Sequence, residues 1–255
     1  MTVIAILQAR TSSTRLQGKV LKPILGKPML QLELERIQKA KLIDKVVIAT
    51  SKHRSDDGVA SLCQTLNIEC FRGELDDVLD RYYQASKKYK PKHIVRVTGD
   101  CPLIDSDIID QVIDLHINSN FDYTSNCEPP TFPDGLDIEI FTFKALKNAW
   151  KESKKPSERE HVTLFIRNNP DLFTCQNYTY KDDLSYLRWT VDEPEDFEFV
   201  TKIYQELYQK KPNFLLKDIL LLLEQKPLLK KINNEFIRNE GLLLSKNKDK
   251  ELGYE

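Results

Sequence analysis

Cysteine is scarce in this 255-residue sequence, and the arrangement of the few that occur excludes two kinds of stabilising site. The five cysteines are an odd number with no C-x-x-C spacing, and they are Cys63, Cys70, Cys101, Cys127 and Cys175. Disulfide frameworks in short secreted chains use even numbers, and zinc sites use closely spaced pairs. We therefore expect neither kind of site, and we expect a reducing compartment.

Long hydrophobic runs are also missing. The most apolar stretch, residues 214–229, is interrupted by four charged residues and a proline, which are Lys217, Asp218, Glu224, Lys226 and Pro227. Such a stretch cannot span a bilayer. The N-terminus has no basic region before its apolar stretch, unlike a signal peptide. We expect a soluble, cytoplasmic protein with no membrane partner.

An excess of charge of one sign is absent as well. Thirty-eight basic and 39 acidic residues leave a net charge of -1. A chain so balanced has no overall field that attracts a nucleic-acid backbone, so we expect no nucleic-acid partner. Any anion that the protein binds must be held by a local cluster of cations. The 40% hydrophobic and 30% charged residues are typical of a globular protein.

The first half of the chain alternates between two hydrophobic patterns. Short apolar, β-branched runs at residues 3–7, 46–49 and 94–97 predict buried strands. Between them, helical periodicity predicts helices at 29–40, 57–66 and 76–89. This order predicts an α/β fold with a mixed, mostly parallel sheet flanked by helices, of the nucleotide-binding type.

The second half predicts further strands at 136–140 and 187–191. The first alternates apolar residues with Asp137 and Glu139, which is typical of a half-buried strand. Pro194 predicts the start of another helix.

A helix from Ser157 to Arg167 is predicted by a capping box formed by Ser157 and Glu160. We expect one domain over residues 1–225 and a C-terminal helical extension and tail over 226–255. The last dozen residues are expected to be frayed.

The segment after the first strand is rich in phosphate-binding residue types. Residues 10–19 contain three cations and four hydroxyl groups; the cations are Arg10, Arg15 and Lys19. In an open α/β sheet, ligands bind beyond the carboxyl ends of the strands, where this segment lies. Guanidinium groups bind phosphate oxygens in pairs, and lysine adds a movable charge. We interpret the segment as a triphosphate-binding loop, the alternative being an ordinary polar surface loop.

Two aspartates follow predicted strands and are candidate metal ligands. Asp100 comes after the strand at 94–97, and Asp192 ends the strand at 187–191. Mg²⁺ is typically held by one or two carboxylates together with substrate phosphates. The alternative is that Asp100 caps a turn and Asp192 caps the helix that starts at Pro194. Asp105-x-Asp107 resembles a D-x-D metal motif but precedes a helical pattern, which favours a helix cap.

Base and acceptor contacts have several candidates. Arg72 ends an apolar strand and can donate to the O2 and N3 acceptors of cytosine, or it can form an ion pair with Glu74, Asp76 or Asp77. Asp137 and Glu139 share one strand face about 7 Å apart and can accept hydrogen bonds from sugar hydroxyls, or they can lie on an exposed face. Arg159 and His161 can meet an acceptor carboxylate or phosphate, or they can be surface residues.

These motifs together resemble the cytidylyltransferase family, which includes the synthetases of CMP-activated ulosonic and sialic acids. The opening Gln8-Ala9-Arg10, followed by Ser13-Thr14-Arg15-Leu16 and Gly18-Lys19-Val20-Leu21, carries the first part of the resemblance. It continues through Phe71-Arg72-Gly73, Thr98-Gly99-Asp100, Gly135-Leu136-Asp137-Ile138-Glu139, Glu158-Arg159-Glu160-His161 and Thr190-Val191-Asp192-Glu193-Pro194. The most similar branch is the spore-coat polysaccharide biosynthesis subgroup.

The resemblance implies that the domain over residues 1–225 is of the nucleotidyltransferase type, and it implies an activity and roles for particular residues. It implies transfer of CMP from CTP to a sugar acid or phosphorylated polyol, with Mg²⁺ as the cofactor, in a homodimer. It implies that Ala9, Arg10, Arg15 and Lys19 contact the substrate, that Arg10 and Lys19 neutralise the leaving pyrophosphate beside a catalytic Asp100, and that Asp100 and Asp192 hold the metal.

Three alternative functions remain to be compared with this one. The loop lacks the glycine-rich opening of sugar-1-phosphate nucleotidylyltransferases, which disfavours another nucleoside triphosphate. A glycosyltransferase that consumes a nucleotide sugar is disfavoured by the triphosphate-sized loop. A nucleotide-sensing protein with a decayed site is disfavoured because Arg10, Lys19, Asp100 and Asp192 occur together.

Overall fold

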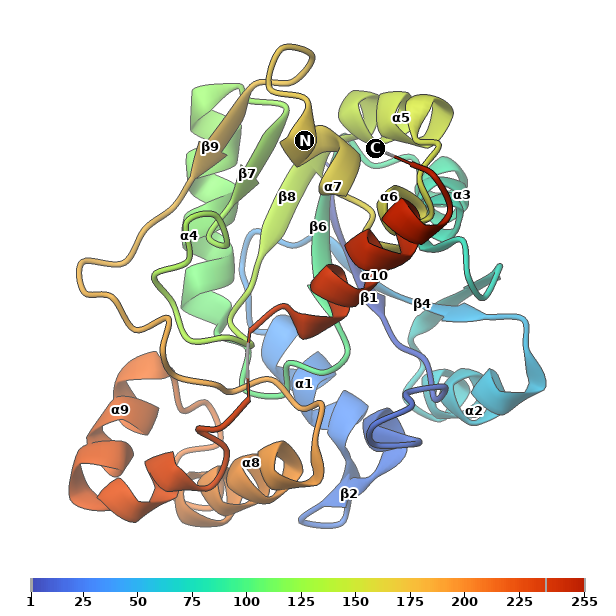
Figure 1. The fold of residues 1–255 in the computed structure, drawn as a ribbon. Helices are drawn as coiled ribbons and strands as arrows, with labels where there is room; N and C mark the ends of the chain where they lie inside the picture. Colours follow the sequence, from blue (N-terminus) through green and yellow to red (C-terminus); the bar gives the residue numbers. More distant parts are fainter. Residues whose placement is uncertain (1, 237, 255) are drawn as a thin grey trace.

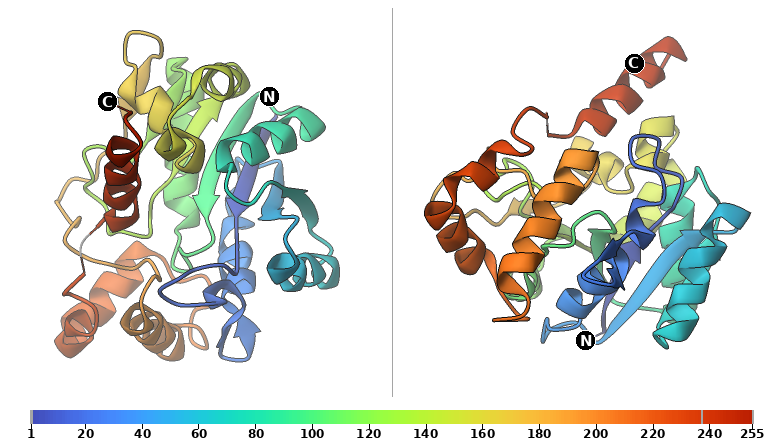
Figure 2. Two further views of the ribbon diagram at one scale, coloured as in Figure 1. Left: turned by 45° about the vertical axis from the view of Figure 1, so that its right-hand side comes forward. Right: turned by 90° about the horizontal axis from the view of Figure 1, so that it is seen from below.

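The computed structural model describes residues 2–236 and 238–254 and contains a seven-stranded mixed sheet with helices on both faces (Figures 1 and 2). The order of the strands across the sheet is β5-β4-β1-β6-β8-β7-β9. Four neighbouring strands, β5, β4, β1 and β6, are parallel, and β8 is antiparallel to both β6 and β7. The predicted fold class is therefore confirmed.

The first half of the chain builds the parallel part. Its sheet strands are β1 (Val3–Gln8), β4 (Lys45–Ser51), β5 (Glu69–Gly73) and β6 (His93–Thr98). A small hairpin is formed by β2 (Pro23–Ile24) and β3 (Lys27–Pro28). The helices are η1 (Lys19–Leu21), α1 (Met29–Ile37), η2 (Arg54–Asp56), α2 (Asp57–Thr65), α3 (Val78–Tyr89) and α4 (Ser106–Ser119).

The second half adds the remaining strands and wraps around the end of the sheet. Its strands are β7 (Tyr123–Ser125), β8 (Glu139–Thr142) and β9 (Cys175–Asn177). Its helices are α5 (Phe143–Glu152), α6 (Pro156–Glu160), α7 (Leu164–Asn168), α8 (Pro194–Leu207), α9 (Leu216–Gln225), η3 (Pro227–Lys231) and α10 (Glu240–Glu251).

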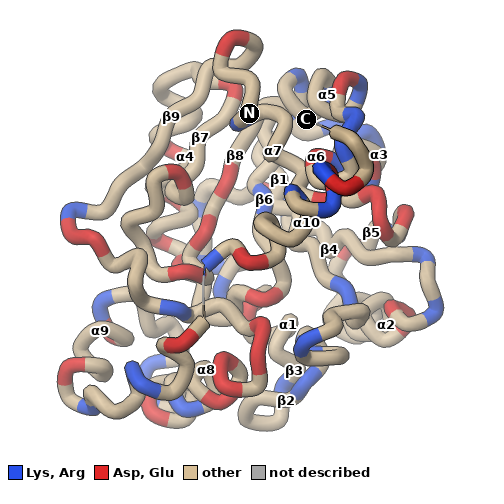
Figure 3. Tube along the Cα trace, viewed as in Figure 1, with Lys and Arg blue, Asp and Glu red and all other residues tan. Residues whose placement is uncertain are grey.

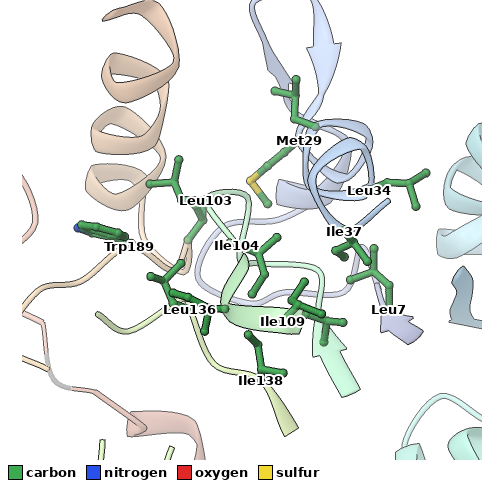
Figure 4. Close-up of a cluster of buried hydrophobic side chains, with 14 of the residues drawn as sticks. Leu7, Met29, Leu34, Ile37, Leu103, Ile104, Ile109, Leu136, Ile138 and Trp189 are labelled. Atoms are coloured by element: carbon green, nitrogen blue, oxygen red, sulfur yellow. The ribbon is translucent and has the colours of Figure 1, made fainter. Parts of the chain in front are cut away.

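Both faces of the sheet are buried, which explains the unbroken apolar run of β1. Ala5 and Leu7 face a core shared with α1, α4, α8 and α9, and Ile4 and Ile6 face a second core shared with α3 and α5. Figure 4 shows part of the first core, where Leu7 lies near Ile37 of α1 and Ile109 of α4, and Trp189 lies on the side of Leu103 and Leu136. A strand covered by helices on both sides is apolar throughout.

Two predicted elements are wrong, and each is replaced by irregular backbone. Residues 187–191 form no strand; Arg188 makes only an isolated bridge to Asp134. The helix predicted over 157–167 is two short helices, α6 and α7, with a break at residues 161–163 where Val162 has φ 39°. The α6 N-terminus is capped by Glu158 rather than Glu160, because the Glu158 carboxylate accepts from the Lys154 and Lys155 backbone N–H groups.

Three further expectations can be compared with the structure. The strand expected over 136–140 begins only at Glu139, and it is not half-buried, because Glu139 is itself buried. The expected frayed tail is wrong, since α10 extends to Glu251 and packs its buried Asp249 on Ser157. All five cysteines are free thiols, as predicted. Within residues 2–236 and 238–254, no helix has the length and apolar character that a bilayer crossing requires.

A buried pair of histidines joins β6 to α4. His93 Nδ1 lies 3.0 Å from His116 Nε2, and His116 Nδ1 lies 2.9 Å from Thr124 Oγ1 on β7. Burial lowers the pKa of His93, and burial with the neighbouring His93 lowers the pKa of His116 to about 4. Both imidazoles are therefore neutral in the folded protein at pH 7.

This pair predicts a loss of stability in mild acid. A histidine whose folded pKa lies below its unfolded value of about 6.5 contributes stability that is present above pH 6.5 and is lost as the pH falls toward 4. At about 1.4 kcal/mol per pKa unit, His116 accounts for about 3 kcal/mol of this loss. We expect urea unfolding of His116→Gln to depend less on pH between 7 and 4.5 than that of the wild type. His53→Gln, at an exposed histidine, should keep the wild-type pH dependence.

Candidate active site

Two adjoining cavities open at the carboxyl ends of the central strands. The first, here called the loop cavity, has a volume of about 350 Å³ and is lined by the segment after β1 and the turn after β6. The second, here called the acidic cavity, has a volume of about 260 Å³ and is lined by six carboxylates and four arginines. Arg15, Thr98 and Asp100 line both cavities, so a ligand in one lies beside a ligand in the other.

The loop cavity receives cations from the predicted phosphate-binding segment. Ala9, Arg10, Arg15 and Lys19 all line it, together with the hydroxyl residues Ser12, Ser13 and Thr14. Figure 3 shows both signs of charge mixed along the whole chain, so this cluster is a local feature. A polar loop with three cations at the end of a parallel sheet is suited to an anionic ligand.

A buried arginine, Arg81, lies behind the half-buried Arg10. Arg10 Nη1 and Arg81 Nη2 both donate to the Leu75 carbonyl oxygen, at 2.7 and 3.2 Å. Arg81 is fully buried, and its Nε and Nη1 have no hydrogen-bond partner among the described residues. Burial and the charge of Arg10 lower the pKa of Arg81 to about 10. Two guanidinium groups that approach one another in this way favour an anion beside them.

The buried carboxylate of Asp56 fixes the start of the loop. Asp56 Oδ1 accepts from the Thr11 backbone N–H at 2.8 Å and from the Thr11 hydroxyl at 2.9 Å. Its other oxygen accepts from the Ser51 backbone N–H and hydroxyl. Burial opposes ionisation, but these hydrogen bonds outweigh it and lower the pKa of Asp56. Asp56 therefore holds the loop against the end of β4.

Lys19 joins the two aspartates that the sequence suggested as metal ligands. Its Nζ lies 3.2 Å from Asp100 Oδ2 and 2.8 Å from Asp192 Oδ1, and it donates to the Val191 carbonyl oxygen at 2.7 Å. Burial opposes the charge, but the two carboxylates outweigh it and raise the pKa of Lys19. Lys19 lowers the pKa of Asp100 in turn, although burial acts the other way. Two carboxylates thus surround one buried cation.

Asp192 reaches Asp100 without the strand that was expected to carry it. The Val191 backbone N–H donates to the Asp100 carbonyl oxygen at 2.8 Å, which sets the two segments side by side. Asp192 is also followed by α8, but the α8 N-terminus is capped by Asp196, which accepts from the Asp192 and Glu193 backbone N–H groups. The side chain of Asp192 therefore faces the cations rather than the helix.

Arg15 bridges the loop to the far side of both cavities. Its guanidinium lies 3.0 Å from Asp192 Oδ1, 3.3 Å from Glu193 Oε1 and 2.7 Å from Glu240 Oε2. Glu240 begins α10, so the loop after β1 contacts the C-terminal helix directly. Arg15 is the residue through which a ligand in the loop cavity would affect that helix.

The floor of the acidic cavity holds Glu139. This carboxylate accepts from the Tyr123 hydroxyl at 2.6 Å and the Thr163 hydroxyl at 2.5 Å, and it pairs with Arg96. Burial raises its pKa, but Arg96 and Arg167 outweigh burial and lower the pKa of Glu139 to about 2. Glu139 is therefore ionised at all physiological pH values.

Asp134 and Asp137 form a second acidic group in this cavity. Arg238 donates to Asp137 and, at 2.9 Å, to the Phe132 carbonyl oxygen. Arg188 Nη1 lies 3.2 Å from Asp134 Oδ2. Burial and the neighbouring Asp137 raise the pKa of Asp134 to about 7. Asp134 can therefore exchange a proton near neutral pH.

Two of the predicted site residues, Arg72 and Arg159, have other partners, and Asp105-x-Asp107 is a helix cap. Arg72 forms an ion pair, as in the alternative interpretation, but its partner is Asp57 at 2.7 Å rather than Glu74, Asp76 or Asp77. Arg72 lines neither cavity. Arg159 donates to Asp77 at 3.0 Å and to the Trp150 carbonyl oxygen, so it joins α6 to α3. Asp105 accepts from the Asp107 and Ile108 backbone N–H groups, so Asp105-x-Asp107 caps α4 as predicted.

His161 does line the acidic cavity, at the break between α6 and α7. Its Nε2 lies 2.9 Å from the Ser245 hydroxyl of α10. Burial lowers the pKa of His161 to about 4, so the imidazole is neutral at pH 7. A neutral imidazole can donate or accept one hydrogen bond at each nitrogen.

The sequence reasoning missed several charged residues of the acidic cavity. Arg96 and Arg188 lie inside apolar runs, and Asp134 and Arg238 lie in irregular segments. Charged residues are almost never buried unless they are paired, so an arginine within an apolar strand pattern was a usable signal. Arg238 had no such signal. It lies 101 residues after Asp137 in the sequence, and only folding brings the two side chains into contact.

Comparison with sequence families assigns nearly the whole chain. The sequence model of the family described as Cytidylyltransferase matches residues 4–232. An uncharacterised protein of Methanocaldococcus jannaschii is 39% identical over 92% of this chain and 95% of its own length. The spore coat polysaccharide biosynthesis protein SpsF of Bacillus subtilis is 32% identical over 88% of this chain and 95% of its own length.

Two further similarities concern a named substrate and a solved structure. A 3-deoxy-manno-octulosonate cytidylyltransferase of Zea mays is 37% identical, but over only 43% of this chain and 37% of its own length. The structure of a cytidylyltransferase from Leptospira borgpetersenii is 34% identical, with a TM-score of 0.87 over 94% of this chain and 100% of that chain.

Proposed function

The chain belongs to the cytidylyltransferase family, and on that premise we propose that it transfers CMP from CTP to a sugar acid or a phosphorylated polyol and releases pyrophosphate. The observation that carries the proposal is the pair of adjoining cavities that share Asp100 and Arg15. In this proposal the cationic loop cavity takes the triphosphate and the acidic cavity takes the acceptor.

Transfer of CMP from CTP depends less on proton transfer than on neutralising the negative charge of the triphosphate and of the leaving pyrophosphate. An acceptor oxygen, either the hydroxyl oxygen of a sugar acid or a phosphate oxygen of a phosphorylated polyol, attacks the α-phosphorus, the bond to the bridging oxygen breaks, and pyrophosphate leaves with that electron pair. Phosphoryl-type transfers of this kind depend mainly on positioning and electrostatic stabilisation. Arg10, Arg15 and Lys19 would neutralise the triphosphate. The proton of the hydroxyl can pass to a carboxylate of the acidic cavity, where Asp134 has a pKa of about 7.

The residues around Lys19 fit the magnesium ion that the resemblance implies. Asp100 and Asp192 direct one carboxylate oxygen each at a single cation, the Lys19 ammonium. Hard oxygen donors of this kind suit Mg²⁺, which keeps its remaining positions for water and substrate phosphates. Asp100 and Asp192 would hold the ion, and the Lys19 ammonium would then pair with the triphosphate. When bound, the ion would supply charge neutralisation of the phosphates.

The acceptor class is supported by the chemistry of the acidic cavity. Asp137 and Glu139 offer carboxylate oxygens to hydroxyl groups. Arg96 and Arg167 line the same cavity, and the Nε–H of each has no hydrogen-bond partner among the described residues. Unpaired buried donors favour an anionic group on the ligand. The relatives named for spore-coat polysaccharide and for 3-deoxy-manno-octulosonate support a role in the synthesis of surface polysaccharide or glycan precursors.

Pyrophosphate release tests this function directly. We expect release from CTP with Mg²⁺ when the acceptor panel contains eight- and nine-carbon 2-keto sugar acids and phosphorylated polyols. The same panel with UTP, GTP and ATP should give slower release. A protein that releases pyrophosphate with none of these combinations, and that CTP does not stabilise thermally, would contradict the proposal.

Lys19→Met tests the triphosphate-binding role of the loop. Losing a charged hydrogen-bond donor to phosphate should cost about 1.5–3 kcal/mol, which is roughly ten- to a hundredfold in kcat/KM for CTP. Lys22→Met, at the next lysine along the chain, should leave kcat/KM unchanged because Lys22 lies outside the residues that line both cavities. Wild-type kinetics in a folded Lys19→Met protein would remove the loop lysine from the mechanism.

A further inference from the structure

The C-terminal segment returns to the active site after leaving the end of the sheet. Beyond η3, the buried Asn233 Nδ2 donates to the Arg188 carbonyl oxygen at 2.9 Å and to Asp196 Oδ1 at 2.8 Å. Phe236 lies beside the Arg188 guanidinium, whose centre is 5.7 Å from the ring. Figures 1 and 2 show the chain then rising, in red, into α10, which lies against α6. The path is thus fixed by buried polar contacts.

The turn before α10 supplies part of the acidic cavity. Asn239, Glu240, Gly241 and Leu242 line it, together with Asp137 and Glu139, just before and at the start of β8. Arg238 fixes the Asp137 carboxylate on the other wall. Asn239 has the left-handed conformation φ 61°, ψ 24°, which turns the chain so that Glu240 meets Arg15. Without this turn the cavity would lack one wall.

Two of the three residues on the face that α10 turns toward the molecule are polar. This face consists of Leu242, Ser245 and Asp249, while Leu243 and Leu244 are 54% and 64% exposed. Ser245 Oγ lies 2.9 Å from His161 Nε2 and donates to Glu160 Oε2 at 2.9 Å. Helices that only stabilise a fold usually bury an apolar stripe. The inward face of α10 instead holds hydrogen-bonding groups around the cavity.

We propose that residues 238–245 are the acceptor-recognition element of the transferase. Arg238 positions Asp137, Ser245 positions His161, and the turn between them closes the cavity around a polyhydroxylated, sugar-like acceptor. The inference rests on the proposed function and adds the segment that selects the acceptor. The family model matches residues 4–232, and residues 238–245 lie beyond that match.

The test compares acceptor kinetics with nucleotide kinetics. Ser245→Ala and Arg238→Lys should each raise the KM for the acceptor about tenfold, the loss expected for one hydrogen bond, and should change the KM for CTP less than twofold. Arg238→Lys keeps the charge of the ion pair, so the protein should remain folded. The control is Lys246→Ala, next to Ser245 on the exposed side of α10, which should match the wild type.

The probes are CTP and the members of the acceptor panel, 3-deoxy-manno-octulosonate among them. If no member is used, the same variants are compared by pyrophosphate release from CTP with water as the acceptor. We then expect faster release in Ser245→Ala than in the wild type, because a loosened wall admits water. Variants that behave like Lys246→Ala, or that change the KM for CTP as much as the KM for the acceptor, would overturn the inference. No pyrophosphate release from CTP by any protein would instead overturn the proposed function.

Discussion

Asp192→Asn should lower kcat by about a thousandfold while leaving the protein folded, and Asp100→Asn should do the same. If both carboxylates hold one Mg²⁺, the loss of either weakens the stabilisation of the transition state by the metal, which is worth several kcal/mol. A rise of about 4 kcal/mol in the activation barrier corresponds to a thousandfold lower kcat. The double variant should be little slower than either single one, because residues that act as a unit are not additive. Steady-state pyrophosphate release over a range of Mg²⁺ and Mn²⁺ measures this, and higher metal should partly restore the single variants.

The same variants separate the metal site from a structural role. Both aspartates contact Lys19, so each change also weakens an ion pair and lowers the free energy of unfolding. Asp218→Asn is a matched control, because Asp218 pairs with Lys211 far from both cavities. Its kcat should be that of the wild type. An Asp192→Asn enzyme with full activity at low Mg²⁺ would leave Asp100 as the only protein ligand.

Arg188→Met should lower the free energy of unfolding by about 3–5 kcal/mol, which is the cost of leaving a buried carboxylate without its partner. Arg188 Nε and Nη2 each lie 2.9 Å from an oxygen of Asp196, which is fully buried, and Nη1 lies 3.2 Å from Asp134. Arg188 contributes to lowering the pKa of Asp196, against the effect of burial. Urea unfolding at pH 7 measures the change.

A second substitution shows whether the cause is the unpaired charge. Adding Asp196→Asn to Arg188→Met removes the buried negative charge, so the double variant should recover part of the loss. Arg54→Met, at an exposed arginine, should change the free energy of unfolding by less than about 0.5 kcal/mol. A loss below about 1 kcal/mol in Arg188→Met would mean that the cluster around Asp196 does not depend on this arginine.

The parallel half of the fold could be predicted from the sequence because local and tertiary signals agree there. The runs that became β1, β4 and β6 are almost entirely apolar, as expected of strands buried on both faces, and Arg96 in β6 is the exception. The cationic segment could be placed for the same reason, since the residues after β1 must lie at the carboxyl end of the sheet. The approach of Asp100 to Lys19 follows from that topology.

Part of the acidic cavity could not be predicted, because long-range contacts decide how it is assembled. Residues 187–191 have a strand-like composition, yet their hydrogen bonds go to Asp100, Asp134 and Asn233 rather than to a neighbouring strand. The lysine-rich C-terminus has no local signal for docking, and its place depends on Asp249 and Ser157, which are 92 residues apart. Pairings of this kind are visible only once the chain has folded.

The fate of the α-phosphate tests the central claim most directly. Incubation with CTP labelled at the α-phosphorus, Mg²⁺ and the acceptor panel should move the label into a CMP conjugate of one acceptor, while the β- and γ-phosphates leave together as pyrophosphate. A parallel incubation with γ-labelled CTP should place all the released label in pyrophosphate. Transfer of the γ-label to the acceptor, or consumption of a nucleotide sugar with release of a nucleoside diphosphate and no use of CTP, would contradict the assignment of this protein as a cytidylyltransferase of sugar-like acceptors.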